Sequence, residues 1–293
     1  MKISQVISNT DKKQFLEAAK IIYKNDKNWV CPLDNDINNI FNPEENDYFN
    51  HGLAERWILQ NQSGELIGRI AAFIDFKTSA AENQPTGGIG FFECVNDQQA
   101  ANLLFDTAKK WLVSKDMEAM DGPINFGERD SYWGLLVDGF THPSYEVAYN
   151  PAYYQQLFES YGFKTYFKQE GFHLDVTKKL PDRFMKIAEW VANKPGYEFK
   201  HFSWKEQDKF TEDFAEVFNT AWDSFKENFE PLKVEYIRNA LEKGKIIIEE
   251  KFIWLAYKNG KPIAIYLMYP DVNEILKYLN GKLNLYTKLK FVY

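Results

Sequence analysis

The most constraining feature of this sequence is a junction at which an apolar strand pattern passes directly into a helix pattern. Residues 91–104 read FFECVNDQQAANLL: the apolar run ends at Val95, and apolar residues recur at helical spacing from Ala100 onward. Asn96, with Gln99 three residues later, predicts the start of that helix. The free N–H groups of a helix start can hold an anion. The junction is therefore either a phosphate-binding turn or a plain tight turn.

Length and charge limit the class of protein. With 293 residues, two domains are expected, and a net charge of −7 without a long basic run disfavours nucleic-acid binding. The two cysteines, Cys31 and Cys94, lie far apart in the sequence, as is typical of a reduced, intracellular protein. We find no signal-peptide pattern and no apolar run long enough to span a bilayer. We therefore expect a cytoplasmic protein that acts on a small molecule and not at a membrane.

Hydrophobic periodicity in the first 176 residues predicts a mixed α/β module. Strand-like and helical patterns alternate along this part of the chain, separated by turns rich in Gly, Asn and Pro. The predicted elements are a helix after Asn9, a hairpin over 56–76, strands over 88–95 and 119–124, a loop over 78–86, a helix over 151–161 and extended chain over 163–176.

Beyond a linker at 177–181 the chain begins a similar pattern again. A helix pattern follows Ser203, and a second hairpin contains Trp254-Leu255-Ala256, which matches Trp57-Ile58-Leu59 of the first. We interpret this as a weak internal duplication. The predicted domains are 1–178 and 179–293, the second incomplete at its C-terminal end.

Several short motifs, in a fixed order, resemble one known family. They are Gly68-Arg69-Ile70, Gly90-Phe91-Phe92-Glu93, Asp121-Gly122-Pro123-Ile124-Asn125-Phe126, Gly134-Leu135-Leu136-Val137-Asp138-Gly139-Phe140, Tyr149-Asn150-Pro151-Ala152-Tyr153-Tyr154, Gly162-Phe163, Pro270-Asp271-Val272-Asn273 and Leu279-Asn280-Gly281. With this order of elements, the chain resembles the acyl-CoA-dependent N-acyltransferase (GNAT) family, and more closely a bacterial group with two such modules in tandem. The resemblance covers most of the chain.

The resemblance implies where a cofactor would bind. Acetyl-CoA or another acyl-CoA would lie in a V-shaped opening between the fourth and fifth strands of a twisted sheet flanked by helices. Here those strands correspond to Gly88–Val95 and Ala119–Ile124. The pyrophosphate would lie on the next helix start, at Asn96–Gln99. The implied cofactor-binding residues are Phe92, Cys94, Val95, Asn96, Asp97, Gln98 and Gln99.

Two features depart from the family pattern. The turn Val95–Gln99 contains no glycine and no cation, and Asp97 would itself satisfy the helix dipole, in competition with an anionic ligand. In Leu157–Phe163, Phe158 stands where the family often has a tyrosine that acts as general acid. Both departures weigh against ordinary acetyl-CoA binding in the first module.

Three residues are candidates for catalysis, and a fourth, Cys94, is weighed beside them. Glu93, near the end of the fourth strand, could deprotonate an amine, directly or through water, although a carboxylate at a strand end is often only solvated. Tyr153 or Tyr154 could replace the missing acid, or both could simply pack in the core with their hydroxyls at its rim. Cys94 could be a nucleophile, but a small buried strand residue is the simpler interpretation.

The long segment from Asp121 to Phe140 is rich in Gly, Asp and aromatic residues, and connections of this length are often functional. It is expected either to bind the acceptor or to cover the opening. Its candidate substrate-binding residues are Asn125, Arg129, Asp130, Tyr132 and Trp133. No metal site is expected, because the histidines are scattered.

Three functions remain open at this point. The first is a GNAT-like N-acyltransferase that moves an acyl group from acyl-CoA to an unknown amine. The second is a non-catalytic module that binds a ligand or partner in a degenerate CoA site. The third follows if the protein continues beyond Tyr293, since a working cofactor turn would then belong to the second module. An unpaired strand edge near 286–293 would also favour a homodimer.

Overall fold

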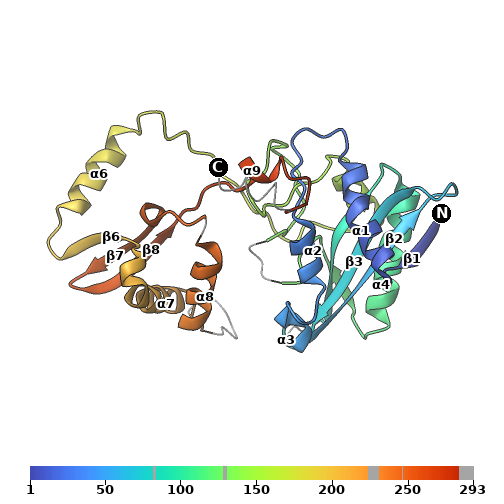
Figure 1. The fold of residues 1–293 in the computed structure, drawn as a ribbon, viewed down its shortest axis with the longest axis horizontal. Coiled ribbons are helices and arrows are strands. Elements are labelled where there is room, and N and C mark those ends of the chain that lie inside the picture. The colour runs from blue at the N-terminus through green and yellow to red at the C-terminus, as the bar shows by residue number, and fades with distance from the viewer. Residues whose placement is uncertain (82–83, 128–130, 224–230, 246, 284–293) are drawn as a thin grey trace. The chain divides into compact units, whose positions relative to one another are not determined.

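The computed structural model describes residues 1–81, 84–127, 131–223, 231–245 and 247–283 (Figure 1). The chain forms two compact units, one made of Met1–Lys168 and Val272–Tyr293 and the other of Gln169–Asp271. The boundaries thus differ from the predicted division at 178, because the chain after Asp271 packs with the first unit. The edge over 286–293, where a homodimer contact was predicted, lies outside the described residues.

The first unit is built on a five-stranded sheet in the order β1-β2-β3-β4-β5. Its neighbouring strands are antiparallel except for β4 and β5, which are parallel and joined through a helix. This topology confirms the predicted mixed α/β fold, a sheet flanked by helices. The strands are β1 (Lys2–Gln5), β2 (Gly52–Gln60), β3 (Leu66–Asp75), β4 (Thr86–Cys94) and β5 (Ala119–Asp121).

Helices cover both faces of this sheet (Figure 1). Helix α1 (Asn9–Ile22) buries Phe15 against the face that carries Ile58 and Ala71. Helix α4 (Gln98–Val113) packs on the other face through the apolar stripe expected from its sequence. Alternation along β2 and β3 therefore sends successive side chains into two separate cores. The buried residues of α4 are Ala100, Ala101, Leu104, Phe105, Ala108 and Leu112, whereas Leu103 and Trp111, which the sequence pattern places in the same stripe, are only partly buried against this core.

Four local predictions need correction. Helix α3 (Phe76–Ala81) occupies the first part of the loop predicted over 78–86, and the Asp75 carboxylate accepts the Lys77 N–H at its start. Helix α5 (Tyr154–Tyr161) begins three residues later than predicted. The fifth strand ends at Asp121, and the segment 163–176 forms no strand. The remaining elements here are α2 (Asp34–Ile40), the 3₁₀ turn η1 (Asp47–Asn50) and α9 (Asn273–Leu276).

The second unit holds a smaller antiparallel sheet in the order β6-β7-β8. Its core is formed by α7, α8 and one face of that sheet, with Phe202 and Leu255 among its buried residues. The elements are α6 (Asp182–Ala192), β6 (Tyr197–His201), η2 (Trp204–Glu206), α7 (Gln207–Asp223), α8 (Val234–Gly244), η3 (Glu250–Phe252), β7 (Ile253–Lys258) and β8 (Lys261–Leu267). Among the described residues, no helix combines the length and apolar character needed to cross a membrane.

Candidate functional site

Strands β4 and β5 separate where the sequence predicts an opening. Their parallel pairing ends at Gly88 and Asp121, and one further hydrogen bond joins Ile124 N–H to Ile89 C=O at 2.8 Å. Two residues further along β4, Phe91 has a φ of 52°, and the pairing of β4 with β3 shifts register there. Such a bulge bends a strand and re-aims its side chains. The remainder of β4 thus turns away from its neighbour.

At Cys94 the edge of β4 is not paired with β5, and its backbone groups hydrogen-bond two of the protein's own tyrosines. The Tyr153 hydroxyl donates to the Cys94 carbonyl at 2.7 Å, and the Cys94 N–H donates to the Tyr154 hydroxyl at 2.8 Å. Tyr154 is 1% exposed. This backbone borders the opening in which the GNAT resemblance places the acyl-CoA. Side chains from α5 therefore fill the opening at this level.

The helix start after β4 carries its own anion. Asp97, not Asn96, is the N-cap of α4, and its carboxylate accepts the N–H groups of Gln99 at 2.8 Å and Ala100 at 3.2 Å. The sequence pattern predicts Asn96 as the cap, but Asn and Asp are about equally good N-cap residues. Only the path of the backbone decides between Asn96 and Asp97. A phosphate at this turn would have to displace the Asp97 carboxylate.

The other predicted cofactor residues have structural partners. Phe92 stacks on Phe105 with ring centroids 4.6 Å apart, and the Cys94 side chain is fully buried. The Val95 N–H donates a hydrogen bond to the Ile67 carbonyl on β3 at 3.0 Å, and Gln98 Nε2 donates to the Leu157 carbonyl on α5 at 3.1 Å. Burial raises the pKa of the Cys94 thiol to about 12, which opposes a nucleophilic role.

Glu93 lies at the centre of a buried polar network. The Tyr154 hydroxyl donates to its carboxylate at 2.8 Å, and Arg69 Nη2 approaches the other carboxylate oxygen at 3.4 Å. The hydroxyl of Tyr23, which follows α1 in the chain, donates to the Tyr149 carbonyl at 3.3 Å. The register of the sheet creates the ion pair, since Arg69 on β3 stands directly opposite Glu93 on β4. A second guanidinium nitrogen of Arg69 donates to the Phe15 carbonyl at 2.9 Å.

Burial sets the protonation chemistry of this network. Desolvation raises the pKa of Glu93 above its ordinary value of 4.5, while the Arg69 charge acts in the opposite direction. Desolvation and the nearby Glu93 charge hold the pKa values of Tyr23 and Tyr154 well above 10. The tyrosines are therefore hydrogen-bond donors at neutral pH, and Glu93 is a carboxylate with an increased affinity for a proton. The arrangement is suited to accept a proton from a bound group.

The network opens into a pocket of about 130 Å³ within the first unit. Glu93, Arg69 and Tyr154 line it together with an aromatic and aliphatic wall. The wall includes Trp29, Val30, Leu33, Ile37, Leu135 and Tyr149. The pocket thus joins a buried acid to an apolar surface, which is the usual composition of a small-molecule site.

The predicted substrate residues are distributed unevenly around this pocket. Tyr132 lines it, whereas Asn125 and Trp133 are not among its lining residues. Asn125 is buried, and its Oδ1 lacks a hydrogen-bond partner among the described residues. Arg129 and Asp130 lie outside the described residues.

Most of the pocket residues come from distant segments and are not predicted as site residues by the sequence, among them Arg69, Tyr23, Asp36 and Glu146. Arg69 had a signal, since a charged residue interrupts the apolar run of β3 and must find a buried partner. Tyr23, Asp36 and Glu146 had none, because nothing local shows that their segments meet.

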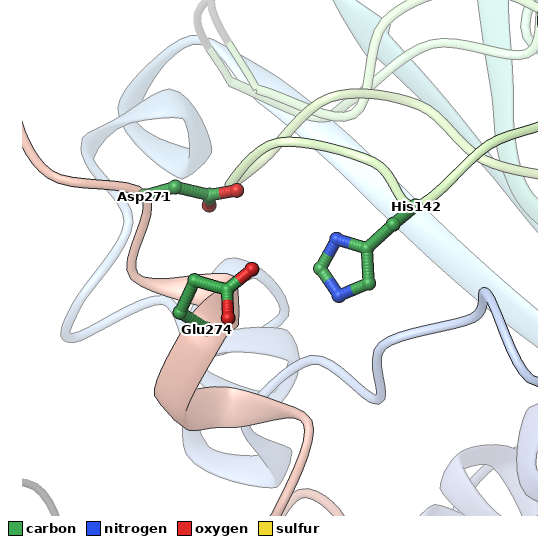
Figure 2. Close-up of side chains that lie close together, drawn as sticks. All are labelled: His142, Asp271 and Glu274. Carbon is green, nitrogen blue, oxygen red and sulfur yellow. The ribbon is translucent and has the colours of Figure 1, made fainter.

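His142, Asp271 and Glu274 place ligand-type atoms within 4.8 Å of one another (Figure 2). No metal site is expected from the sequence, in which these three residues lie far from any ligand motif. His142 Nε2 is buried without a hydrogen-bond partner among the described residues. Glu274, however, already pairs with Lys277 Nζ at 2.6 Å, and that hydrogen bond lowers its pKa. A metal cation would have to compete with Lys277 for the Glu274 carboxylate. The closeness of these three side chains is by itself no evidence of a metal site.

Comparison with known proteins gives distant relatives. No family model matches the chain. It is 26% identical over 276 residues to the bacterial ceramide synthase of Caulobacter vibrioides, covering 92% of this chain and 70% of that protein. It is 24% identical over 282 residues to the protein YghO of Escherichia coli, covering 94% of this chain and 70% of YghO.

A solved GCN5-related glucosamine N-acetyltransferase region of a fungal multi-domain GH3 β-N-acetylglucosaminidase overlaps with a TM-score of 0.44 and 11% identity. The overlap covers 90% of this chain but only 27% of the fungal one. The fold assignment rests on the strand order of the first unit.

Proposed function

We propose that this protein is an N-acyltransferase that joins an acyl group from acyl-CoA to an amine bound in the pocket of the first unit. The observation that carries the proposal is the buried Glu93 carboxylate, held by Tyr154 and Arg69 at the wall of a pocket that also has an aromatic and aliphatic surface. Ceramides are N-acylated amines, so the similarity to a protein named bacterial ceramide synthase supports the same reaction class.

In this proposal Glu93 acts as general base. It takes a proton from the acceptor nitrogen, which forms a C–N bond to the thioester carbonyl carbon as the C–S bond breaks. Tyr153 is better placed than Tyr154 to give a proton to the departing thiolate, because Tyr153 is only partly buried while Tyr154 is enclosed and bonded to Glu93. Binding of the donor along β4 requires both tyrosine hydroxyls to release the Cys94 backbone.

The test is a direct assay of thiol release. The full chain is mixed with acetyl-CoA or palmitoyl-CoA and a panel of primary amines, and free CoA is measured with a thiol reagent while mass spectrometry detects the amide. We expect amine-dependent CoA release that Glu93→Gln abolishes. Release that is equal in wild type and variant, or absent with every amine, would contradict the proposal.

A second candidate is supported by a different observation. The Asp97 carboxylate and the two tyrosine hydroxyls occupy the positions that an acyl-CoA would need. A non-catalytic module would bind a small molecule in the pocket and leave these contacts unbroken. Calorimetric titration separates the two functions, since the transferase binds acyl-CoA at micromolar concentration and the binding module does not bind it at millimolar concentration.

A further inference from the structure

Helix α6 in the second unit leaves its apolar side chains in contact with solvent. None of its 11 residues is buried, and Phe184 and Trp190 are 61% and 63% exposed. Helices α7 and α8 of the same unit instead bury apolar residues in its core, and Figure 1 shows α6 standing apart from them. Because an amphipathic helix is normally stabilised by burial of its apolar side, α6 has a surface that a partner can cover.

The side chains of α6 are sorted by chemistry around the helix axis. At about 3.6 residues per turn, Phe184, Ile187 and Val191 lie along one side of the helix. Asp182 and Glu189 lie on the opposite side, two turns apart. The two acids therefore point away from any partner that covers the apolar side.

Two cations lie at the border of the apolar side. Arg183, Lys186, Ile187 and Trp190 are spaced at three and four residues, and these four side chains line a shallow hollow on α6. Neither Arg183 nor Lys186 forms an ion pair or a side-chain hydrogen bond with another described residue. A guanidinium and an ammonium group beside an indole ring thus offer an anion a basic border next to an apolar surface.

The segment around α6 is basic although the chain is acidic. Residues 178–194 contain five cations and two acids, a net charge of +3, whereas the whole chain has a net charge of −7. Lys179 pairs with Asp182 at 2.8 Å, but their side chains are 81% and 73% exposed, so this pair is weak. Apolar side chains just before the helix are exposed as well, namely those of Phe172, Leu174, Val176 and Leu180.

We propose that α6 and the basic residues 178–194 around it form a docking surface for an anionic lipid bilayer. Phe184 and Trp190 enter the boundary between headgroups and acyl chains, while Arg183 and Lys186 meet the phosphates. A bilayer takes up apolar side chains of any shape, whereas a protein partner would need a matching groove. This inference goes beyond the proposed function, since it concerns where the protein works.

The expectation that the protein does not act at a membrane came from the lack of a run long enough to span a bilayer. With 11 residues, α6 is too short to span one. A helix that lies along the surface needs no such length, because only its apolar side enters the lipid.

The test is sedimentation of the full chain with vesicles of phosphatidylcholine, alone or with about 30% phosphatidylglycerol. We expect at least about tenfold tighter binding to the anionic vesicles, and weaker binding in about 0.5 M NaCl, because salt screens the charges. Phe184→Ala with Trp190→Ala, and separately Arg183→Gln with Lys186→Gln, should each weaken binding about tenfold or more. Anionic vesicles should also slow amide hydrogen exchange in residues 182–192.

Matched variants remove the same kinds of side chain elsewhere. Tyr236→Ala with Tyr278→Ala removes two aromatic side chains that are 59% and 66% exposed, and Lys243→Gln with Lys251→Gln removes two exposed cations. Both double variants should bind anionic vesicles within about twofold of wild type. Circular dichroism should show wild-type folding for all four variants, because the substituted side chains are exposed.

Three results would overturn the docking surface: no binding to anionic vesicles, equal binding to both kinds of vesicle, or α6 variants that bind as well as the matched controls. If wild type does not bind vesicles and light scattering shows a dimer that Phe184→Ala with Trp190→Ala separates, α6 contacts a second copy of the chain and the inference is wrong. Amine-dependent CoA release is measured without vesicles, so its failure would overturn only the proposed function.

Discussion

The two units share one run of elements but complete it differently. Apart from short 3₁₀ turns, β1 to β3 and β6 to β8 are each built in the order strand, helix, helix, strand, strand, and each forms an antiparallel sheet in sequence order. The first unit then adds β4, α4 and β5, so that helices cover both sheet faces. In the second unit, side chains on β6 and β8 remain exposed, among them Phe199, Ile263 and Tyr266.

This difference decides where an ion pair can be buried. In the first unit the side chains of Arg69 and Glu93 are 7% and 12% exposed. In the second unit Asp213 is buried and accepts the Tyr257 hydroxyl, but its partner Lys209 is 63% exposed. A sheet covered on both faces keeps both charges away from water. In such a low-dielectric interior the two charges interact strongly and their proton affinities shift. A reactive carboxylate is therefore expected in the first unit.

The largest expected effect is on the reaction itself. Replacing Glu93 by Gln removes the base and should lower kcat/KM for amide formation by about 10²–10⁴-fold. The matched variant Asp213→Asn changes the buried acid of the second unit and should alter kcat/KM only a few-fold. Steady-state kinetics with acyl-CoA and an amine checks both. A comparable loss in Asp213→Asn would show that the second unit takes part in the chemistry.

The next effect concerns stability. Arg69→Met leaves Glu93 buried without its cation and should lower the free energy of unfolding by about 3–5 kcal/mol. Lys209→Met removes a largely exposed partner and should cost about 1 kcal/mol or less. Urea unfolding followed by circular dichroism measures both. Similar losses would mean that the two ion pairs are equally shielded from water, contrary to the comparison.

A smaller effect tests the close approach at the opening. A Cβ on Gly90 would overlap the Ile124 carbonyl oxygen, which is backbone and cannot rotate away. Gly90→Ala should therefore cost about 1–3 kcal/mol of unfolding free energy. Gly171→Ala, in the second unit, has open space around the added methyl and should change it by less than about 0.5 kcal/mol. Thermal unfolding distinguishes them, and a neutral Gly90→Ala would show that the strands can separate freely.

The smallest effect is a shift along the pH axis. Because burial raises the pKa of Glu93, the acidic limb of kcat/KM should lie above pH 4.5, with activity increasing as Glu93 loses its proton. The folded state binds this proton more tightly than the unfolded chain does. Its stabilising contribution is therefore present below the unfolded pKa and is lost as the pH rises through the folded pKa. A limb at or below pH 4.5 would place Glu93 in contact with water.

Local sequence patterns determined much of the fold. The apolar stripe of α4 and the alternation in the two hairpins predict elements that the structure confirms, because burial on one face is encoded in the spacing of nearby residues. The family resemblance, not the periodicity, brings Glu93 and Tyr154 forward as candidates, and the structure joins them by a hydrogen bond. Their catalytic roles stay predictions.

Only the tertiary structure decided how the site is assembled. The Arg69–Glu93 pair depends on strand register, and the pocket wall combines Tyr23, Asp36 and Glu146 with Asn273 from the segment that returns after the second unit. Asp97 rather than Asn96 caps α4 because the chain turns one residue later. Periodicity reports which residues are buried, whereas their partners depend on packing between segments far apart in the chain, which no local spacing records.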